Sequence, residues 1–277
     1  MLFDTHCHPN LTKVKNKDQI IKNFQKENPE GFLNIIWTNP ETNKDIIEIS
    51  NKYKNVYCSV WIHPCDIYDL NLEETLLDLE NQIKENKEKI IAIWECWLDY
   101  YWLKPENDEK IAKYEKKYQN EIINKKKLLQ KIFFKSQLLL AQKYSLPVVI
   151  HNRESKDDIL LILKELNFKN FIFHCYSENL EYAKELIKFS PDCKISFSGI
   201  VTFKNAHDIQ ETAKNIDIKH ILAETDSPYL TPSPFRWKEE NEPLFTKYIV
   251  EKIEELRWEK ISNTIFKNSI NTFWLNK

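Results

Sequence analysis

Short apolar runs alternate along this chain with longer segments that have helical periodicity. Eight runs are rich in β-branched or aromatic residues, a composition typical of buried strands. These runs cover residues 2–8, 32–37, 56–63, 90–95, 146–152, 171–176, 194–199 and 220–226. Between them, apolar residues recur three and four positions apart with charged residues on the opposite face, which predicts helices buried on one side. The clearest helical segments are 41–53, 72–87, 155–166, 179–189 and 205–215.

This alternation predicts an α/β fold, a (β/α)₈ TIM barrel. Eight strands with intervening helices occupy about 250 residues in such barrels, close to the length of this chain. A doubly wound open sheet is the main rival, but it does not need eight units. Linkers rich in Pro, Gly or Ser and internal repeats are both missing from the sequence. We therefore expect a single domain over residues 1–277.

Two segments lie outside the strand–helix alternation. Residues 104–135, after the fourth predicted strand, form a Lys/Glu/Asn-rich insertion whose interspersed acidic residues favour a solvated surface element over a nucleic-acid arm. Its apolar residues, which predict an amphipathic helix, are Ile111, Tyr114, Tyr118, Ile122 and Ile123. The tail, residues 261–275, predicts a closing helix. The apolar residues expected to face inward there are Ile265, Phe266 and Phe273.

Composition narrows the class of protein. The 277 residues are 42% hydrophobic and 30% charged with a net charge of −2, which excludes a disordered chain and a strongly basic DNA-coating protein. No apolar run approaches the roughly 18 residues of a membrane span, and no signal peptide is evident. Six cysteines lack paired zinc-type spacing, which favours reduced thiols. We expect a cytoplasmic protein with no membrane partner and no obligatory protein partner.

Side chains suited to metal binding fall at the ends of predicted strands. Five of the seven histidines do so: His6, His8, His63, His151 and His174. Glu95 closes the fourth strand and Asp226 the eighth. All strands of a parallel barrel end on one face, so these side chains are expected to converge at one mouth. Imidazole and carboxylate ligands suit zinc, manganese, iron or magnesium, and the sequence therefore predicts a metal site.

The spacing of these residues adds detail. His6 and His8, two positions apart on a strand, project to the same side and can bind one ion together. Glu95 lies midway among the candidate ligands and can bridge two ions; a pair about 4 Å apart would contact both the attacking and the leaving oxygen of a phosphoester. Cys7 and Cys96 alternate away from the mouth, which favours buried thiols over ligands.

At these residues the sequence resembles the TatD family of metal-dependent deoxyribonucleases, which are amidohydrolase-like barrels. The resemblance runs nearly end to end, and the order of its motifs is more specific than any one of them. The motifs are residues 3–8 (Phe-Asp-Thr-His-Cys-His), 62–64 (Ile-His-Pro), 95–101 (Glu-Cys-Trp-Leu-Asp-Tyr-Tyr), 147–153 (Pro-Val-Val-Ile-His-Asn-Arg), 173–177 (Phe-His-Cys-Tyr-Ser), 196–199 (Ser-Phe-Ser-Gly) and 224–230 (Glu-Thr-Asp-Ser-Pro-Tyr-Leu).

The resemblance implies a hydrolase that cleaves DNA phosphodiester bonds by a two-metal mechanism, with the character of a 3′→5′ exodeoxyribonuclease. The substrate would be single-stranded DNA or 3′ ends, and the cofactors two divalent ions, Mg, Mn or Zn. One ion would be held by His6, His8, Glu95 and Asp226. The second would be held by Glu95, His151 and His174.

The resemblance also implies roles around the metals. His63 would lie near the substrate, and Asp226 would also accept a proton. Arg153, Arg236 and Lys238 match positions expected near DNA phosphates, where a guanidinium suits the anion. For Arg236 and Lys238, a solvated surface loop is an equal alternative.

Two other functions stay open. A barrel hydrolase of a small molecule, such as an amide, lactone or phosphotriester, is the first; a strand-end lysine for a carbamate bridge would indicate it, and none is found. The second is a catalytically silent DNA-binding or scaffold homologue whose tryptophans fill the site.

The chain contains 2 glycines and 8 tryptophans, an unusual ratio. Tryptophan stands where the family has glycine at five positions, 37, 61, 94, 97 and 237. Trp258 and Trp274 are further candidates, and Trp102 has no assignment. We hypothesise that these codons are UGA, read as glycine in the source. Several overpacked indoles, at about 1–3 kcal/mol each, approach the whole stability of a domain, so the glycine form is predicted to fold and bind metal better.

Overall fold

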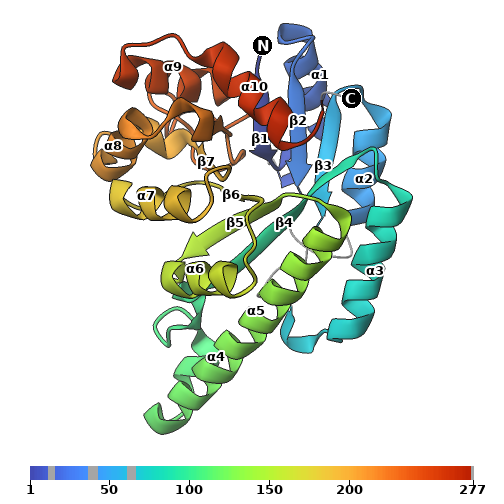
Figure 1. The fold of residues 1–277 in the computed structure, drawn as a ribbon, viewed down its shortest axis with the longest axis vertical. Coiled ribbons are helices and arrows are strands. Elements are labelled where there is room, and N and C mark those ends of the chain that lie inside the picture. Colours follow the sequence, from blue (N-terminus) through green and yellow to red (C-terminus); the bar gives the residue numbers. More distant parts are fainter. Residues whose placement is uncertain (12–15, 37–42, 61–66, 276–277) are drawn as a thin grey trace.

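Eight parallel strands form one sheet in the order β1 to β8 in the computed structural model, which describes residues 1–11, 16–36, 43–60 and 67–275. The strands are β1 (Phe3–Cys7), β2 (Phe32–Ile36), β3 (Val56–Val60), β4 (Ile90–Asp99), β5 (Val148–Arg153), β6 (Phe171–Phe173), β7 (Lys194–Phe197) and β8 (Ile221–Ala223). Helices alternate with them on the outside (Figure 1). The sheet curls into a nearly closed barrel, so the predicted (β/α)₈ fold and its eight strands are confirmed.

Three helices begin directly after an asparagine whose side chain caps them. Asn16, Asn71 and Asn179 each accept a hydrogen bond from a backbone N–H of the first turn that follows. The helices are α1 (Lys17–Glu27), α2 (Asn43–Lys52), α3 (Leu72–Glu85), α4 (Glu109–Ala112), α5 (Lys116–Tyr144), α6 (Lys156–Glu165), α7 (Leu180–Phe189), α8 (His207–Asn215), α9 (Thr246–Arg257) and α10 (Ser262–Thr272). All five predicted helical segments are present; α1 and α9 are additional.

The apolar core has two parts. The larger part lies between the strands and the surrounding helices and includes Cys7 and Cys96, which are fully buried as predicted. The smaller part includes residues from β1, β2, β4, β5, β6 and β8 together with α10. Where it meets α10, Phe273 packs on Phe3 with ring centroids 5.5 Å apart, and Phe266 packs on Phe32 at 5.8 Å. The predicted closing helix is therefore confirmed.

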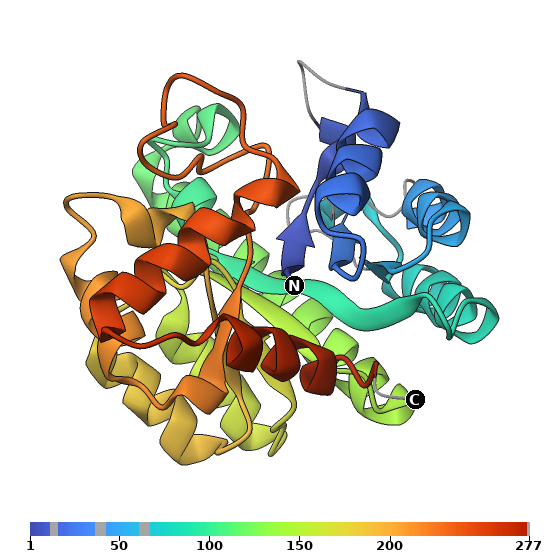
Figure 2. The same ribbon diagram turned by 90° about the horizontal axis from the view of Figure 1, so that it is seen from above.

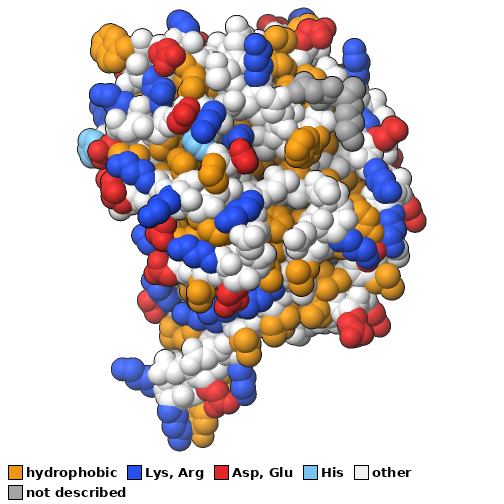
Figure 3. Space-filling model, viewed as in Figure 1, with side chains coloured by type: hydrophobic (Ala, Val, Ile, Leu, Met, Phe, Trp, Pro, Cys, Tyr) orange, Lys and Arg blue, Asp and Glu red, His pale blue; other side chains and the backbone are white. Residues whose placement is uncertain are grey.

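The insertion after β4 contains two helices. Asp108 caps the short α4: its carboxylate accepts from two backbone N–H groups and also pairs with Lys126 of α5 at 3.0 Å. The expected helix is present as α5, which contains Tyr118, Ile122 and Ile123, whereas Ile111 lies in the separate α4 and Tyr114 lies between the two helices. Ile111 is buried, but Tyr114 and Tyr118 are exposed. The amino-terminal part of α5 projects from the body (Figure 1), with basic, acidic and apolar side chains on its surface (Figure 3).

The described helices include none that is both long and apolar enough to span a membrane. The five cysteines in the described part of the chain are Cys7, Cys58, Cys96, Cys175 and Cys193, and each is a free thiol. Cys65 lies outside the described residues.

Backbone hydrogen bonds join the end of β1 to the segment that follows β8. Figure 2 shows the barrel from above, with β1 at the N-terminus in blue. The Asp226 N–H donates to the His6 carbonyl at 3.0 Å, and the His8 N–H donates to the Ser227 carbonyl at 2.7 Å. We refer to these contacts between residues 4–8 and 225–227 as the closing seam.

A buried carboxyl group reinforces the closing seam. Asp4 is fully buried and accepts three hydrogen bonds, from the Thr225 N–H at 2.9 Å, the Thr225 hydroxyl at 2.5 Å and the His6 N–H at 3.2 Å. Burial raises the pKa of this carboxyl group well above its usual value, against the opposing effect of the hydrogen bonds from Thr225. One side chain thereby satisfies donors on both sides of the seam.

Replacement of Asp4 by alanine should lower the free energy of unfolding by about 3 kcal/mol, because buried donors would lose their acceptor. Asp4→Asn should retain most of the stability, since an amide oxygen can accept from the two N–H groups. Chemical denaturation measures both, with exposed Asp192→Ala as the control. Equal stability of Asp4→Ala and the unaltered protein would contradict this role.

Candidate metal centre

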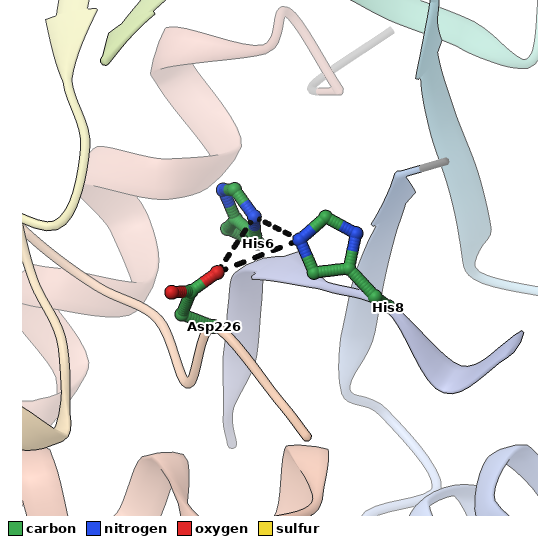
Figure 4. Close-up of side chains that lie close together, drawn as sticks. All are labelled: His6, His8 and Asp226. Atoms are coloured by element: carbon green, nitrogen blue, oxygen red, sulfur yellow. Dashed lines mark hydrogen bonds and ion pairs between the residues drawn. The ribbon is translucent and has the colours of Figure 1, made fainter. Parts of the chain in front are cut away.

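Three side chains bring ligand atoms together across the closing seam. The Nε2 atoms of His6 and His8 are 2.7 Å apart, and Asp226 Oδ1 lies 3.1 Å from the first and 3.4 Å from the second (Figure 4). His6 lies in β1 and His8 directly follows the strand; their side chains point to the same side, as their spacing predicts, and Asp226 follows β8. Asp226 has a left-handed backbone conformation (φ 55°), which turns the chain immediately after the strand. We call these three residues the seam group.

A second group lies at the ends of β5, β6 and β8. His151 Nδ1 is 2.8 Å from His174 Nε2, and His174 Nδ1 is 3.1 Å from Glu224 Oε1. Glu224 is fully buried and also accepts a hydrogen bond from the Cys175 N–H at 2.7 Å. We call His151, His174 and Glu224 the β5–β8 group.

The two groups share a boundary. The rings of His6 and His174 stack with centroids 4.4 Å apart and planes 13° from parallel. Suitably placed ligand atoms of His6, His174 and Glu224 all lie within 4.8 Å of one another, as do those of the seam group. His6 therefore belongs to both sets of candidate ligands.

Neighbouring acceptors fix the histidine tautomers. His8 Nδ1 lies 3.0 Å from the Ile36 carbonyl, which can only accept, so this nitrogen carries the proton and Nε2 faces the seam group. By the same reasoning, His174 donates through Nδ1 to Glu224, and its Nε2 faces His151. Orientation of an imidazole by an acceptor on its far side is typical of metal-ligating histidines.

Burial controls the charges of the seam group. It lowers the pKa of His6 to about 4, with a further lowering by nearby His174, so His6 is neutral at pH 7. Burial alone would raise the pKa of Asp226, but the adjacent His6 and His8 side chains hold it well below its usual value. The seam group thus presents the neutral imidazole of His6 beside a carboxylate.

The donor set fits a divalent metal ion. Neutral imidazole nitrogens and carboxylate oxygens are ligands for Zn²⁺ or Mn²⁺. Among the described residues, buried His6 Nδ1 and Glu224 Oε2 have no hydrogen-bond partner, although buried polar atoms normally have one. The close approach of two histidine nitrogens to one carboxylate oxygen is an arrangement that a cation would stabilise.

Of the other predicted site residues, some are described by the structure and others are not. His63 lies outside the described residues. The backbone of Glu95 lies in β4 within a register shift against β5, between Trp94 and Cys96, and its side chain is outside the described part. Arg153 ends β5, two positions beyond His151.

Of the three predicted phosphate-binding cations, Arg153 lies at the end of β5, and Arg236 and Lys238 lie in the segment between β8 and α9. The Arg153 guanidinium stacks 3.9 Å from the Tyr101 ring centroid and 5.3 Å from that of Trp102. Arg236 follows β8 and stacks 3.8 Å from the Phe203 ring centroid, whereas Lys238 is exposed.

Sequence reasoning missed two polar residues at this centre. Glu224 was assigned no role, yet it lies two positions before Asp226, the same spacing that singled out His6 and His8. Asp4 stands two positions before His6 and could have been found in the same way. Both are fully buried in the structure.

The Trp94 side chain packs against the centre from the barrel interior. Its ring centroid lies 4.0 Å from that of His6 and 4.7 Å from that of His174, edge to face in both cases. Trp94 is 1% exposed, and within the described residues its Nε1 has no hydrogen-bond partner. An indole therefore occupies the space beside the boundary between the two groups.

Comparison with known proteins places this chain among similar ones. The uncharacterized metal-dependent hydrolase YabD from Bacillus subtilis is 34% identical over all of both chains. The uncharacterized metal-dependent hydrolase MG009 from Mycoplasma genitalium is 32% identical over 98% of each. The crystal structure of YjjV, a TatD homologue from Escherichia coli, covers 99% of this chain with a TM-score of 0.78 at 21% identity and shows the same fold. The model of the family described as TatD related DNase matches residues 3–274, and the chain belongs to this family.

Proposed function

We propose that the protein is a metal-dependent hydrolase that cleaves DNA phosphodiester bonds, as a 3′→5′ exodeoxyribonuclease. Family membership and the names of its relatives support a metal-dependent hydrolase. The observation that carries the proposal is the convergence of the seam group and the β5–β8 group at the carboxyl ends of the strands, where barrel enzymes have their active sites.

The proposed ligands form two sets. His6, His8 and Asp226 would hold one ion, and His151 and His174 a second, with Glu95 proposed between them. A divalent ion held there polarises a phosphoryl oxygen and makes water a better nucleophile. The Ile36 carbonyl and Glu224 orient the imidazoles of His8 and His174, so little reorganisation is needed on binding.

Asp226 is the proposed proton acceptor. Its Oδ1 faces the two histidines, and Figure 4 shows its second oxygen turned away from both rings. Both ion pairs with the histidines use Oδ1, so the second oxygen is the one proposed to take the proton lost by the attacking water. His63 is proposed to lie near the substrate.

Arg153 is the proposed phosphate contact supported by its position. Alternate residues of a strand point to the same side, so Arg153 projects on the side of His151, at the same end of β5. Stacking on Tyr101 holds its guanidinium in one plane, which favours bidentate contacts to phosphate. Arg236 and Lys238 are proposed as weaker, outer contacts.

Hydrolysis of a small molecule is the second candidate. The barrel fold suits such chemistry equally. However, no described strand ends in the lysine that a carbamate bridge requires, and the stacked Arg153 beside the ligands favours a phosphodiester. A catalytically silent homologue would lack turnover altogether.

Cleavage of single-stranded DNA should depend on the two carboxylates. With Mn²⁺ or Mg²⁺, Glu95→Ala and Asp226→Ala should each lower kcat on the order of 1,000-fold, the loss of several kcal/mol of transition-state stabilisation. A 5′-labelled oligonucleotide should shorten one nucleotide at a time, and a 3′-terminal phosphorothioate should slow this.

Asp208→Asn is the matched control, because Asp208 is an exposed carboxylate on α8. It should cleave at the unaltered rate. Full activity in both Glu95→Ala and Asp226→Ala would contradict the two-metal proposal. Turnover of esters or lactones with no DNA cleavage would favour the small-molecule alternative.

Metal binding should stabilise the folded protein. At about 100 times its dissociation constant, a divalent ion adds about 2.7 kcal/mol, a rise of several degrees in Tm for a protein of this size. Chelation by EDTA should reverse the rise, and Asp226→Asn should diminish it while Asp208→Asn keeps it. A Tm insensitive to Zn²⁺, Mn²⁺ and Mg²⁺ would count against the site.

Arg153 should affect DNA binding more than chemistry. Arg153→Ala is expected to raise KM for single-stranded DNA about tenfold with a smaller change in kcat, and to flatten the dependence of binding on salt concentration. Lys188→Ala removes an exposed cation at the carboxyl end of α7, on the opposite side of the barrel, and should change neither. Equal effects of the two substitutions would exclude a specific role.

A further inference from the structure

Three tryptophans have a backbone conformation that tryptophan rarely adopts. Ten described non-glycine residues have a positive φ, and three of them are Trp237 (69°), Trp258 (54°) and Trp274 (55°). Tryptophan is only 8 of the 277 residues, so the share is high. A bulky side chain is disfavoured in this region, whereas glycine is not.

Two of these tryptophans end helices at the position that glycine most often occupies. After α9, the Glu259 N–H donates to the Glu254 carbonyl at 3.3 Å around Trp258. After α10, the Leu275 N–H donates to the Ile270 carbonyl at 3.0 Å around Trp274. Both are Schellman-type ends with the left-handed residue at C′.

Similar helix ends in this chain have small polar residues. Ser145 after α5 and Asn167 after α6 have positive φ and the same type of backbone hydrogen bond, and short polar side chains are common there. The indoles at the other two ends are mostly in solvent, because Trp258 is 92% exposed and Trp274 is 61% exposed. Trp237 is 89% exposed.

The two glycines of the chain do not serve such turns. A Cβ at Gly199 would lie 1.8 Å from the Leu230 carbonyl oxygen, and one at Gly31 would lie 2.9 Å from that of Leu2. Both are needed for close backbone approach, and neither has a positive φ. At residues 237, 258 and 274, tryptophan therefore has a left-handed backbone conformation that glycine would adopt without strain.

Trp94 is buried, unlike the three exposed tryptophans, but glycine would suit its position too. Its indole is among the largest fully buried side chains, lies against His6 and His174, and has an Nε1 that no described residue accepts from. A buried N–H without an acceptor is disfavoured, as is a large ring beside a group of candidate metal ligands. The same exchange, glycine for tryptophan, removes the conflict at all four positions.

We infer that the protein made by its own cells has glycine at residues 94, 237, 258 and 274, and that the small residue at 94 leaves room beside His6 and His174 for a divalent metal ion. One codon read as glycine, in place of the tryptophan written here, accounts for all four. The metal part of this inference rests on the proposed function; the identity of the residues does not.

Trp102 is a contrasting case within the same chain. It lies in the 3₁₀ turn Tyr101–Leu103, its φ is not positive, and its ring packs on Tyr101 with centroids 5.1 Å apart and under the Arg153 guanidinium at 5.3 Å. These contacts use the indole, so we expect residue 102 to be a true tryptophan.

Peptide sequencing by mass spectrometry, on protein isolated from the source cells, tests the inference directly. Peptides covering residues 94, 237, 258 and 274 should contain glycine, and the peptide covering residue 102 should contain tryptophan. Tryptophan at any of the first four positions overturns the inference.

Recombinant variants test the role of residue 94. Titration of the chain as printed and of Trp94→Gly with Mn²⁺ alone should show affinity about 10- to 100-fold higher in the glycine variant, the range found when groups around metal ligands are altered. Trp94→Phe keeps a ring in this space and should bind like the printed chain. Equal affinity of Trp94→Gly and the printed chain overturns the role of residue 94.

The surface positions give a test that is independent of the metal site. The triple variant Trp237→Gly, Trp258→Gly, Trp274→Gly should raise Tm by several degrees, because it relieves three left-handed conformations. Trp102→Gly should lower Tm. A triple variant no more stable than the printed chain contradicts the inference. Tighter Mn²⁺ binding by Trp94→Gly without DNA cleavage would contradict the proposed nuclease alone.

Discussion

The closing seam between β1 and β8 is the constraint on which the rest of the site depends. Asp4 accepts hydrogen bonds from Thr225 and His6, and backbone bonds join residues 6 and 226 directly. Because His6 lies in β1, His8 directly follows it and Asp226 follows β8, their ligand atoms meet only if the end of β1 bonds to the segment after β8. Closure of the barrel and assembly of the seam group are therefore the same structural event.

The stacked rings of His6 and His174 extend this dependence to the second group. Burial and the proximity of His174 keep His6 neutral, and ligand atoms of imidazoles and carboxylates lie within 4.8 Å of one another in this buried region. A divalent ion bound there would balance the negative charge of the carboxylates. The carbonyl of Ile36 and the carboxylate of Glu224 hold the rings in place before any ligand arrives, which limits the ordering cost of binding.

Periodicity was sufficient to predict the barrel, because each strand is a short buried run and each helix has one apolar face. It also placed His6, His8, His151, His174 and Asp226 at strand ends, which is why they converge. It failed where tertiary contacts decide: Asp108 caps α4 and pairs with Lys126 of α5, and the roles of Asp4 and Glu224 depend on partners far away in sequence. Spacing alone cannot show that Glu224 orients His174 by a hydrogen bond whereas Asp226 is a candidate metal ligand.

The seam joins residues 221 positions apart, Asp4 and Thr225. A ribosome releases the amino-terminal strand first, and its partner emerges only when most of the chain has been made. During synthesis, β1 has no neighbour on one side, and its two histidines lack their carboxylate. A truncated chain that ends before β8 therefore cannot assemble the seam group. The three ligand side chains can therefore come together only after β8 and the residues that follow it have been synthesised.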